Sequence, residues 1–176
     1  MKRLIGVFTC AALLPLLAVP AKAADDPDSR ASLKGITTIR VLVSVCEELD
    51  GTVSGTDLLT DAELRLRQSG IHVLAPEETG DRMTGGVLAI SLSCYRPIPE
   101  LRLFCVEPGV ALCQYAALPR NPAKQLLVET WSTHDVLVGD SNNLWMFRRT
   151  RDTVRGFLDQ FLNAYLAANP KPTGAR

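Results

Sequence analysis

Histidine is the side chain best suited to acid–base chemistry near neutral pH, and the sequence contains two, His72 and His134. His72 alternates with Ile71 and Val73 in a short apolar segment, which favours a rim position without a catalytic role. His134 is followed by Asp135, and a carboxylate can orient an imidazole for general base catalysis. A small hydrolase or transferase centred on His134 and Asp135 is therefore one hypothesis, although adjacent residues of a regular strand point to opposite faces.

The sequence contains no other spacing typical of a catalytic or cofactor-binding motif. It has no G-x-S-x-G nucleophile elbow, no H-E-x-x-H metal helix and no glycine-rich phosphate loop. Two pairs of adjacent acids, Glu47-Glu48 and Glu77-Glu78, lie in expected loops, where exposure to solvent accounts for them. We therefore expect a protein without enzymatic activity, and neither a cofactor nor a metal.

Cysteine chemistry is the second possibility. Cys10 lies in a segment that we expect to be removed, which leaves Cys46, Cys94, Cys105 and Cys113. An even number of cysteines in an exported chain favours two disulfides. Of the three possible pairings, alternation along the expected strands favours Cys94–Cys105 and Cys46–Cys113. A thiol redox or metal protein that uses Cys94 and Cys105 is an alternative, although the sequence has no C-x-x-C pair.

The first 23 residues have the three parts of a secretory signal peptide. Lys2 and Arg3 are basic, residues 4–19 are mostly apolar, and Ala21 and Ala23 are the small residues that signal peptidase reads. Cleavage after Ala23 would deliver a soluble chain to the periplasm, because no later apolar run is long enough to span a bilayer. The sequence does not separate periplasmic residence from secretion onward.

Charge and length limit the function classes further. Lys2, Arg3 and Lys22 leave with the signal peptide, so 16 basic residues remain against 19 acidic ones, a net charge of −3. A general nucleic-acid-binding protein is basic, so this balance argues against one. Removal of 23 residues from 176 leaves 153, which suits a single domain with one core.

A basic and aromatic segment near the C-terminus is the strongest candidate binding site. Trp145 precedes Arg148, Arg151 and Arg155 in one predicted helix, and the three arginines share a face at spacings i, i+3 and i+7. Cations in the first turns oppose the helix dipole, so a binding role would explain them. Arginine suits carboxylate and phosphate groups, so we expect an envelope protein or another anionic envelope component as partner. Alternatively, the arginines pair with acids of this chain and Trp145 lies in the core.

Two further aromatic residues, Trp131 and Tyr115, are candidates on neighbouring predicted strands. Trp131 alternates with Glu129 and Thr133, which predicts a half-exposed indole on the polar face of the sheet. Together with Tyr115 it would form a ligand platform or cap an otherwise open sheet face.

Hydrophobic periodicity places these residues on strands and helices. The predicted strands cover residues 36–46, 71–75, 87–95, 101–118 and 125–138. The fourth strand should bulge or bend at Pro108-Gly109. A capping serine, Ser54, and a terminating glycine, Gly70, bound a first helix over residues 55–69.

The second helix begins after Asp140 or Ser141 and ends before Pro170, and its apolar stripe runs from Val154 to Leu166. The element order β-α-β-β-β-β-α predicts an α/β fold with a single mixed sheet and both helices packed on one face. The expected parts are a signal peptide (1–23), a flexible lead (24–35), one α/β domain (36–168) and a disordered tail (169–176).

Four segments of the exported chain carry a resemblance: LLTDAELRLRQSGI at 58–71, RNP at 120–122, ETW at 129–131 and FLNAYLAANP at 161–170. Through them, most of the exported chain resembles a group of small exported bacterial proteins of unknown function. The predicted architecture is also distantly similar to the α/β amino-terminal domain of the translocation protein TolB, a non-catalytic adaptor. These resemblances imply an exported α/β domain and assign no functional residues, because a fold does not determine a function.

Overall fold

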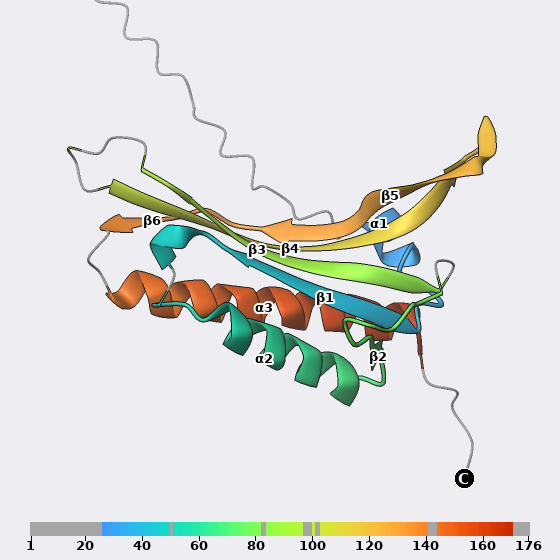
Figure 1. The fold of residues 1–176 in the computed structure, drawn as a ribbon, viewed down its shortest axis with the longest axis horizontal. Coiled ribbons are helices and arrows are strands. Elements are labelled where there is room, and N and C mark those ends of the chain that lie inside the picture. The colour runs from blue at the N-terminus through green and yellow to red at the C-terminus, as the bar shows by residue number, and fades with distance from the viewer. Residues whose placement is uncertain are drawn as a thin grey trace, which may run out of the picture.

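The computed structural model describes residues 26–49, 51–81, 84–96, 100, 103–140 and 144–170. The expected signal peptide and residues 171–176 of the expected tail lie outside them. Within the described residues, the chain forms one mixed sheet whose two long helices cover the same face (Figure 1). The predicted fold class is confirmed.

The described elements are three α-helices, a short 3-10 turn and six strands. In chain order they are α1 (Pro27–Ala31), β1 (Thr38–Val45), η1 (Glu47–Leu49), α2 (Gly55–Gln68), β2 (His72–Val73), β3 (Gly85–Tyr95), β4 (Leu103–Leu118), β5 (Asn121–His134), β6 (Leu137–Asp140) and α3 (Leu144–Ala168). No helix in the described part of the chain is both long enough and apolar enough to cross a membrane.

The sheet combines a parallel half and an antiparallel half. Its strand order is β2-β1-β3-β4-β5, with β1 parallel to both β2 and β3. Strands β3, β4 and β5 form an antiparallel meander, and β6 also pairs with β4. Because α2 connects the parallel neighbours β1 and β2, it must cross over one face of the sheet, as parallel connections require.

Helix α2 forms where its capping residues predict it. The Ser54 hydroxyl accepts a hydrogen bond from the backbone N–H of Asp57 (3.1 Å), which satisfies one of the free donors of the first turn. Leu58, Ala62 and Leu66 are buried against the sheet. Gly70 has a φ of 89°, a left-handed conformation that glycine adopts without strain and that ends the helix.

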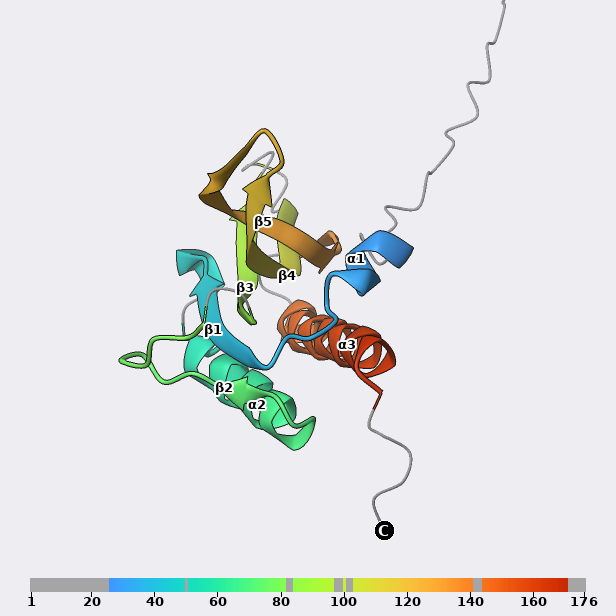
Figure 2. The ribbon, with the colours of Figure 1, turned by 90° about the vertical axis from the view of Figure 1, so that its right-hand side faces the viewer.

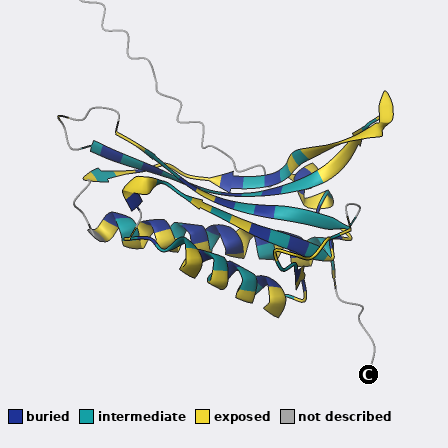
Figure 3. Cartoon of the chain, in the orientation of Figure 1, coloured by how far each residue is buried: buried dark blue, intermediate teal, exposed yellow. Residues whose placement is uncertain are grey.

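Helix α3 supplies the other half of the core. Its buried residues include Val154, Leu158 and Phe161, which follow the predicted apolar stripe, whereas Leu166 at the end of that stripe is exposed. Figure 3 shows the buried residues concentrated between the helices and the sheet. Of the two residues expected to cap this helix, Ser141 lies outside the described residues, and Asp140 is the last residue of β6.

The predicted last strand is two strands, and the predicted bulge is elsewhere. Strands β5 and β6 pair with successive parts of β4, and Asp135 lies in the short break between them. Pro108 does not interrupt the hydrogen bonding of the sheet, because it lies opposite the gap between β5 and β6. Its carbonyl accepts a hydrogen bond from the Asp135 N–H (3.1 Å), and the N–H that proline lacks would face this gap. The register of β4 against β5 instead shifts between Leu112 and Cys113.

Both ends of the expected domain extend further than predicted. Part of the expected flexible lead forms α1, and Leu33 after it is fully buried. Asn169, assigned to the disordered tail, donates from its side chain to the Leu33 carbonyl (2.9 Å) and accepts from the Gly35 N–H (2.8 Å). Figure 2 shows α1 beside α3. Periodicity did not reveal this segment because α1 is only five residues long.

Candidate functional site

One face of the sheet carries no helix, and we call it the outer face. Burial alternates along β1, β3 and β4, so residues next to core positions point outward. Large apolar side chains are exposed there: Leu42 (53%), Tyr95 (53%) and Val138 (54%). Tyr95 and Val138 both pair with Cys105, whereas Leu42 lies beside Ala89 further along the strands. The sequence signal for this face is the second, outward-facing set of residues along each strand.

The centre of the outer face is built from small residues. Ala89 pairs with Ala111, and Ala111 pairs with Ser132. One step along, Ser91 pairs with Gly109. These small side chains lie on β3, β4 and β5, and the exposed His134 pairs with Gly109 from β5 at the same level of the sheet.

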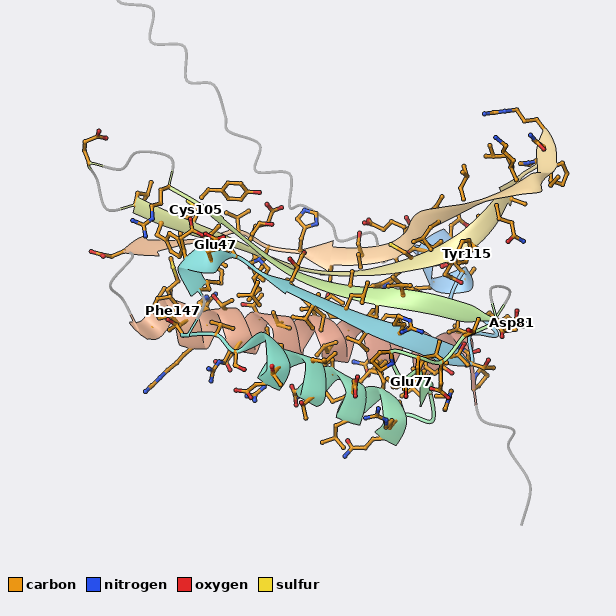
Figure 4. All side chains as sticks on the ribbon, in the orientation of Figure 1. Glu47, Glu77, Asp81, Cys105, Tyr115 and Phe147 are labelled. Carbon is orange, nitrogen blue, oxygen red and sulfur yellow. A yellow bond between two sulfur atoms is a disulfide. The ribbon has the colours of Figure 1, made fainter. Side chains whose placement is uncertain are left out.

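A pocket of about 410 Å³ opens at one end of the outer face, under the loop of residues 74–81. Arg40 holds this loop by donating hydrogen bonds to the backbone carbonyls of Pro76 (2.9 Å) and Glu78. Tyr115 and Leu127 line the opposite wall. Figure 4 shows Tyr115 at the same end of the molecule as Glu77 and Asp81.

The acidic loop is fixed by hydrogen bonds of its own. The Ala75 N–H donates to the Glu78 carboxylate (2.7 Å), and this bond, with the nearby His72 and Arg40, holds the pKa of Glu78 below its usual range. The His72 imidazole lies 3.5 Å from the same carboxylate. His72 is thus a rim residue that pairs with a loop acid, in agreement with its predicted position.

The expectation that Trp131 is half-exposed is wrong. Its side chain is fully buried, opposite Leu112 on β4 and 5.3 Å from the Phe161 ring in an edge-to-face contact. The polar neighbours misled the assignment: Thr133 is itself buried and donates to Gln160 (3.3 Å). The register shift between Glu129 and Trp131 places Glu129 opposite Cys113. Trp131 and Tyr115 therefore do not form a platform.

The predicted arginine site divides into two groups. Arg151 donates to the Thr52 carbonyl (3.0 Å), and Arg155 lies 3.5 Å from the Asp61 carboxylate, so both tie α3 to the α2 region. Arg148 is exposed and, among the described residues, forms no hydrogen bond or ion pair. Trp145 is exposed (55%) rather than in the core, and the guanidinium of Arg149 lies 5.6 Å from its ring centroid.

This pattern leaves Trp145, Arg148 and Arg149 as a basic aromatic patch at the start of α3. All three side chains are exposed. Arg149 was not among the predicted site residues because it lies off the i, i+3, i+7 face. A cation 5.6 Å from an indole is within the range of a cation–π interaction, which pre-orients the pair at the surface.

The structure does not support the His134/Asp135 hypothesis. Both side chains are exposed, and the Asp135 carboxylate accepts from the Val136 N–H (2.8 Å). No hydrogen bond or ion pair between His134 and Asp135 occurs within the described residues. The geometry required for a carboxylate-oriented base is therefore missing.

Both predicted disulfide pairings are wrong. Cys94 bonds to Cys46, and both Cys105 and Cys113 are free. The parity argument considered only the hairpin partner of β3, whereas β1 lies on the other side of β3 and its end brings Cys46 to Cys94. Glu48 lies within 4.8 Å of both sulfurs, but the disulfide leaves no thiolate there to bind a metal. The redox or metal hypothesis for Cys94 and Cys105 is overturned with the pairing.

Comparisons with known proteins give a likeness of fold only. No protein-family model matches the chain, and no curated protein matches it significantly. Solved structures similar to it include the PelC dodecamer from Paraburkholderia phytofirmans (TM-score 0.40, 14% identity, covering 74% of this chain and 87% of that one). Others are the hypothetical protein CT253 from Chlamydia trachomatis (0.31, 10%, 70% and 98%) and the rare lipoprotein B from Shewanella oneidensis (0.29, 16%, 73% and 92%). At these values the likenesses carry no argument about function.

Proposed function

We propose that this chain is an exported, non-enzymatic binding module of the bacterial envelope, which binds an acidic surface of an envelope protein. The binding site is the basic aromatic patch of Trp145, Arg148 and Arg149. The observation that carries the proposal is the exposure of Trp145 beside two exposed arginines, one of which, Arg149, lies against its ring.

The two groups of arginines on α3 have different roles in this proposal. Arg151 and Arg155 contact the α2 region and contribute to the fold. Arg148 and Arg149 extend into solvent and are free to pair with carboxylates in two-pronged hydrogen bonds. Tryptophan and arginine are the residue types most enriched among those that dominate binding energy at interfaces.

Two features support export. The first 23 residues have the pattern of a signal peptide, and the Cys46–Cys94 disulfide is of a kind that persists in oxidising compartments. An acidic partner also fits the site electrostatically, since complementary charge speeds association and selects against basic partners.

Photo-crosslinking inside cells tests the site. A photoreactive phenylalanine at position 145 should crosslink to an acidic envelope protein, and the same probe at Leu64, an exposed residue of α2, should not. Replacing Arg148 and Arg149 by alanine should remove the product at position 145, whereas alanine at Arg151 and Arg155 should leave it.

Two results would contradict the proposal. One is a crosslink at position 145 that persists without Arg148 and Arg149. The other is co-sedimentation with vesicles of an anionic phospholipid that depends on the same arginines, since this would identify a lipid surface as the ligand.

A further inference from the structure

We propose that the pocket under the loop of residues 74–81 binds an organic cation, in which an amidine, guanidine or amine group is attached to an apolar body. Figure 4 shows Tyr115 of this pocket at one end of the molecule and Phe147, near the basic aromatic patch, at the other. The pocket is therefore a separate site, and the inference does not depend on the function proposed above.

The pocket has the size of a small-molecule site, and its shape is fixed by the chain. Its volume of about 410 Å³ lies within the range of about 300–1,000 Å³ that ligand pockets occupy. Arg40 ties the loop to the sheet through its hydrogen bonds to two loop carbonyls. At Gly85 a Cβ would come within 2.5 Å of the Asp81 carbonyl oxygen, so only glycine lets the loop lie this close to β3. A ligand therefore enters a space that is already formed.

The charges around the pocket favour a cation. The described residues that line it carry three carboxylates and one guanidinium, a net charge of −2, and they are Glu77, Glu78, Asp81 and Arg40. The Arg40 guanidinium is directed at the loop backbone by its hydrogen bonds to the Pro76 and Glu78 carbonyls. Glu78 stays ionised at neutral pH, because its hydrogen bond from the Ala75 N–H lowers its pKa.

Apolar and aromatic side chains line the rest of the pocket. They are contributed by the loop, β3, β4 and β5, and include Leu74, Val87, Tyr115 and Leu127. The face of a tyrosine ring attracts a cation that lies within about 6 Å of the ring centroid. The aliphatic side chains gain stability when the apolar part of a ligand covers them. The pocket therefore suits a cation that has an apolar body.

The arrangement of the acids separates an organic cation from a metal ion. A metal site needs several ligand atoms that converge, but within the described residues no three His, Cys, Asp or Glu ligand atoms of this pocket lie within 4.8 Å of one another. The Cys113 thiol is held protonated, because burial and the Glu129 carboxylate raise its pKa, and it is the thiolate that binds metals. Carboxylates that are spread along a loop suit the larger, flat charge of an amidinium or guanidinium group.

A buried hydroxyl beside the pocket is the second observation that points to a ligand. The Thr38 Oγ1 is buried and has no hydrogen-bond partner, and no other buried side-chain nitrogen or oxygen of the described residues is in this state. Thr38 lies on the same face of β1 as Arg40 and pairs with Gly85. Its hydroxyl is 2.9 Å from the position that a Cβ on Gly85 would take.

The position of this hydroxyl connects it to the pocket. Buried hydroxyls in proteins almost always have a partner, and leaving one unpaired costs stability. Gly80 and Gly85 both line the pocket, and both lie next to Thr38. A polar group of a bound molecule that reaches between these glycines would supply the partner that the chain does not.

Three probes of matched shape test the preference for a cation. Benzamidine, benzamide and benzoate share a phenyl ring and differ in charge, and each is titrated while the backbone amide signals are followed by NMR. Benzamidine should shift the signals of Gly85 and Gly86 with saturation and leave that of Gly156, on α3, in place. Benzamide should bind at least tenfold more weakly, and benzoate should cause no shift.

A matched pair of variants places the cation at the loop. Glu77 is exposed, lines the pocket and forms no hydrogen bond or ion pair with any other described residue, so Glu77→Gln should leave the fold unchanged. It should weaken benzamidine at least fivefold. Asp152→Asn removes an equally exposed carboxylate from α3 and should leave the affinity for benzamidine unchanged.

Three results would refute the inference. They are equal affinity for the three probes, the absence of any shift at Gly85 and Gly86 with benzamidine, and equal effects of the Glu77 and Asp152 substitutions.

A fourth probe identifies the source of the cation. Arginine whose amino and carboxyl groups are blocked as amides presents the same flat charge as a side chain of a protein. Tighter binding of this probe than of benzamidine would assign the pocket to an arginine of a protein segment. Weaker binding would assign it to a free small molecule, and either result supports a cation site.

Discussion

The two faces of the sheet are built by the same strands and differ in whether helices cover them. The face under the helices contains Leu112, Trp131 and Phe104, all almost completely buried. The outer face presents Leu42 and Tyr95, both more than half exposed. Successive residues of a strand point to opposite sides, so a single residue step separates the core from the exposed face.

The comparison of the two faces shows that residue type alone does not reveal which face of the sheet is buried. Both faces contain leucines, aromatic residues and cysteines, and what separates them is the presence of α2 and α3 on one side. Hydrophobic burial stabilises the covered face within the monomer, whereas equivalent groups on the outer face gain that stabilisation only when another surface covers them.

The largest expected effect is the loss of Trp131. Trp131→Ala removes an indole from a filled core, so the free energy of unfolding should fall by about 3–5 kcal/mol. Leu42→Ala on the outer face should change it by less than about 0.5 kcal/mol. Urea denaturation at low protein concentration measures both, and a similar cost at the two positions would break the contrast between the faces.

The Cys46–Cys94 disulfide comes next. It joins the ends of β1 and β3 across 48 residues of sequence and limits the freedom of the unfolded chain. Replacing both cysteines by alanine should lower the free energy of unfolding by about 2–4 kcal/mol. Alanine at Cys105 and Cys113 provides the control, since neither forms a disulfide within the chain, and an equal loss in the control would show that packing rather than the bond is responsible.

A polar group on the covered side provides a pH-dependent test. The Tyr165 hydroxyl donates to the Ile36 carbonyl (3.0 Å), and burial raises the pKa of the phenol. Tyr165→Phe should cost about 1 kcal/mol at neutral pH.

The sign of the pH dependence follows from the raised pKa. The folded state holds the Tyr165 proton more tightly than the unfolded state, so its stabilising contribution is complete below the unfolded pKa near 10. This contribution is lost as the pH rises through the folded pKa. Thermal denaturation between pH 8 and 11 should therefore show a steeper decline for wild type than for Tyr165→Phe, and parallel declines would contradict the assignment.

The smallest expected change in the free energy of unfolding distinguishes the two groups of arginines on α3. Arg155→Ala removes an exposed ion pair with Asp61 and should cost at most about 1 kcal/mol. Arg148→Ala, which removes no hydrogen bond or ion pair among the described residues, should leave the free energy of unfolding unchanged. Denaturation of both variants under identical salt conditions makes the comparison, and a measurable loss in Arg148→Ala would indicate a structural role for that residue.

Sequence reasoning predicted the elements whose signals are local. The caps of α2 and the alternation along β3 are determined by residues close in sequence, and both elements form as expected. The pairing of Cys46 with Cys94 depends on β1 lying beside β3, which no local pattern encodes. Trp131 was misassigned because the buried Thr133 next to it on the same face gave that face a polar pattern.

The candidate site was predicted only in part, because local spacing does not show which residues distant in sequence lie beside it. Helical spacing brought Trp145 and Arg148 to attention, but it also included Arg151 and Arg155, whose partners lie nearly a hundred residues away. Such partners become visible only when α2 and α3 are placed side by side. The outer face needed the same information, since no residue pattern states which side of a sheet the helices will cover.

The hydrogen bonds that join residues 33–36 to Tyr165 and Asn169 govern when the domain can be completed. They connect positions 129 to 136 residues apart, so the first part of the fold is finished by the last helix. A chain that emerges N-terminus first, from a ribosome or through a translocation channel, therefore keeps Leu33 and Ile36 without their final neighbours until α3 has emerged. The domain can therefore complete its fold only after the last helix has emerged. Until then, the residues that pack against α3 remain without these contacts.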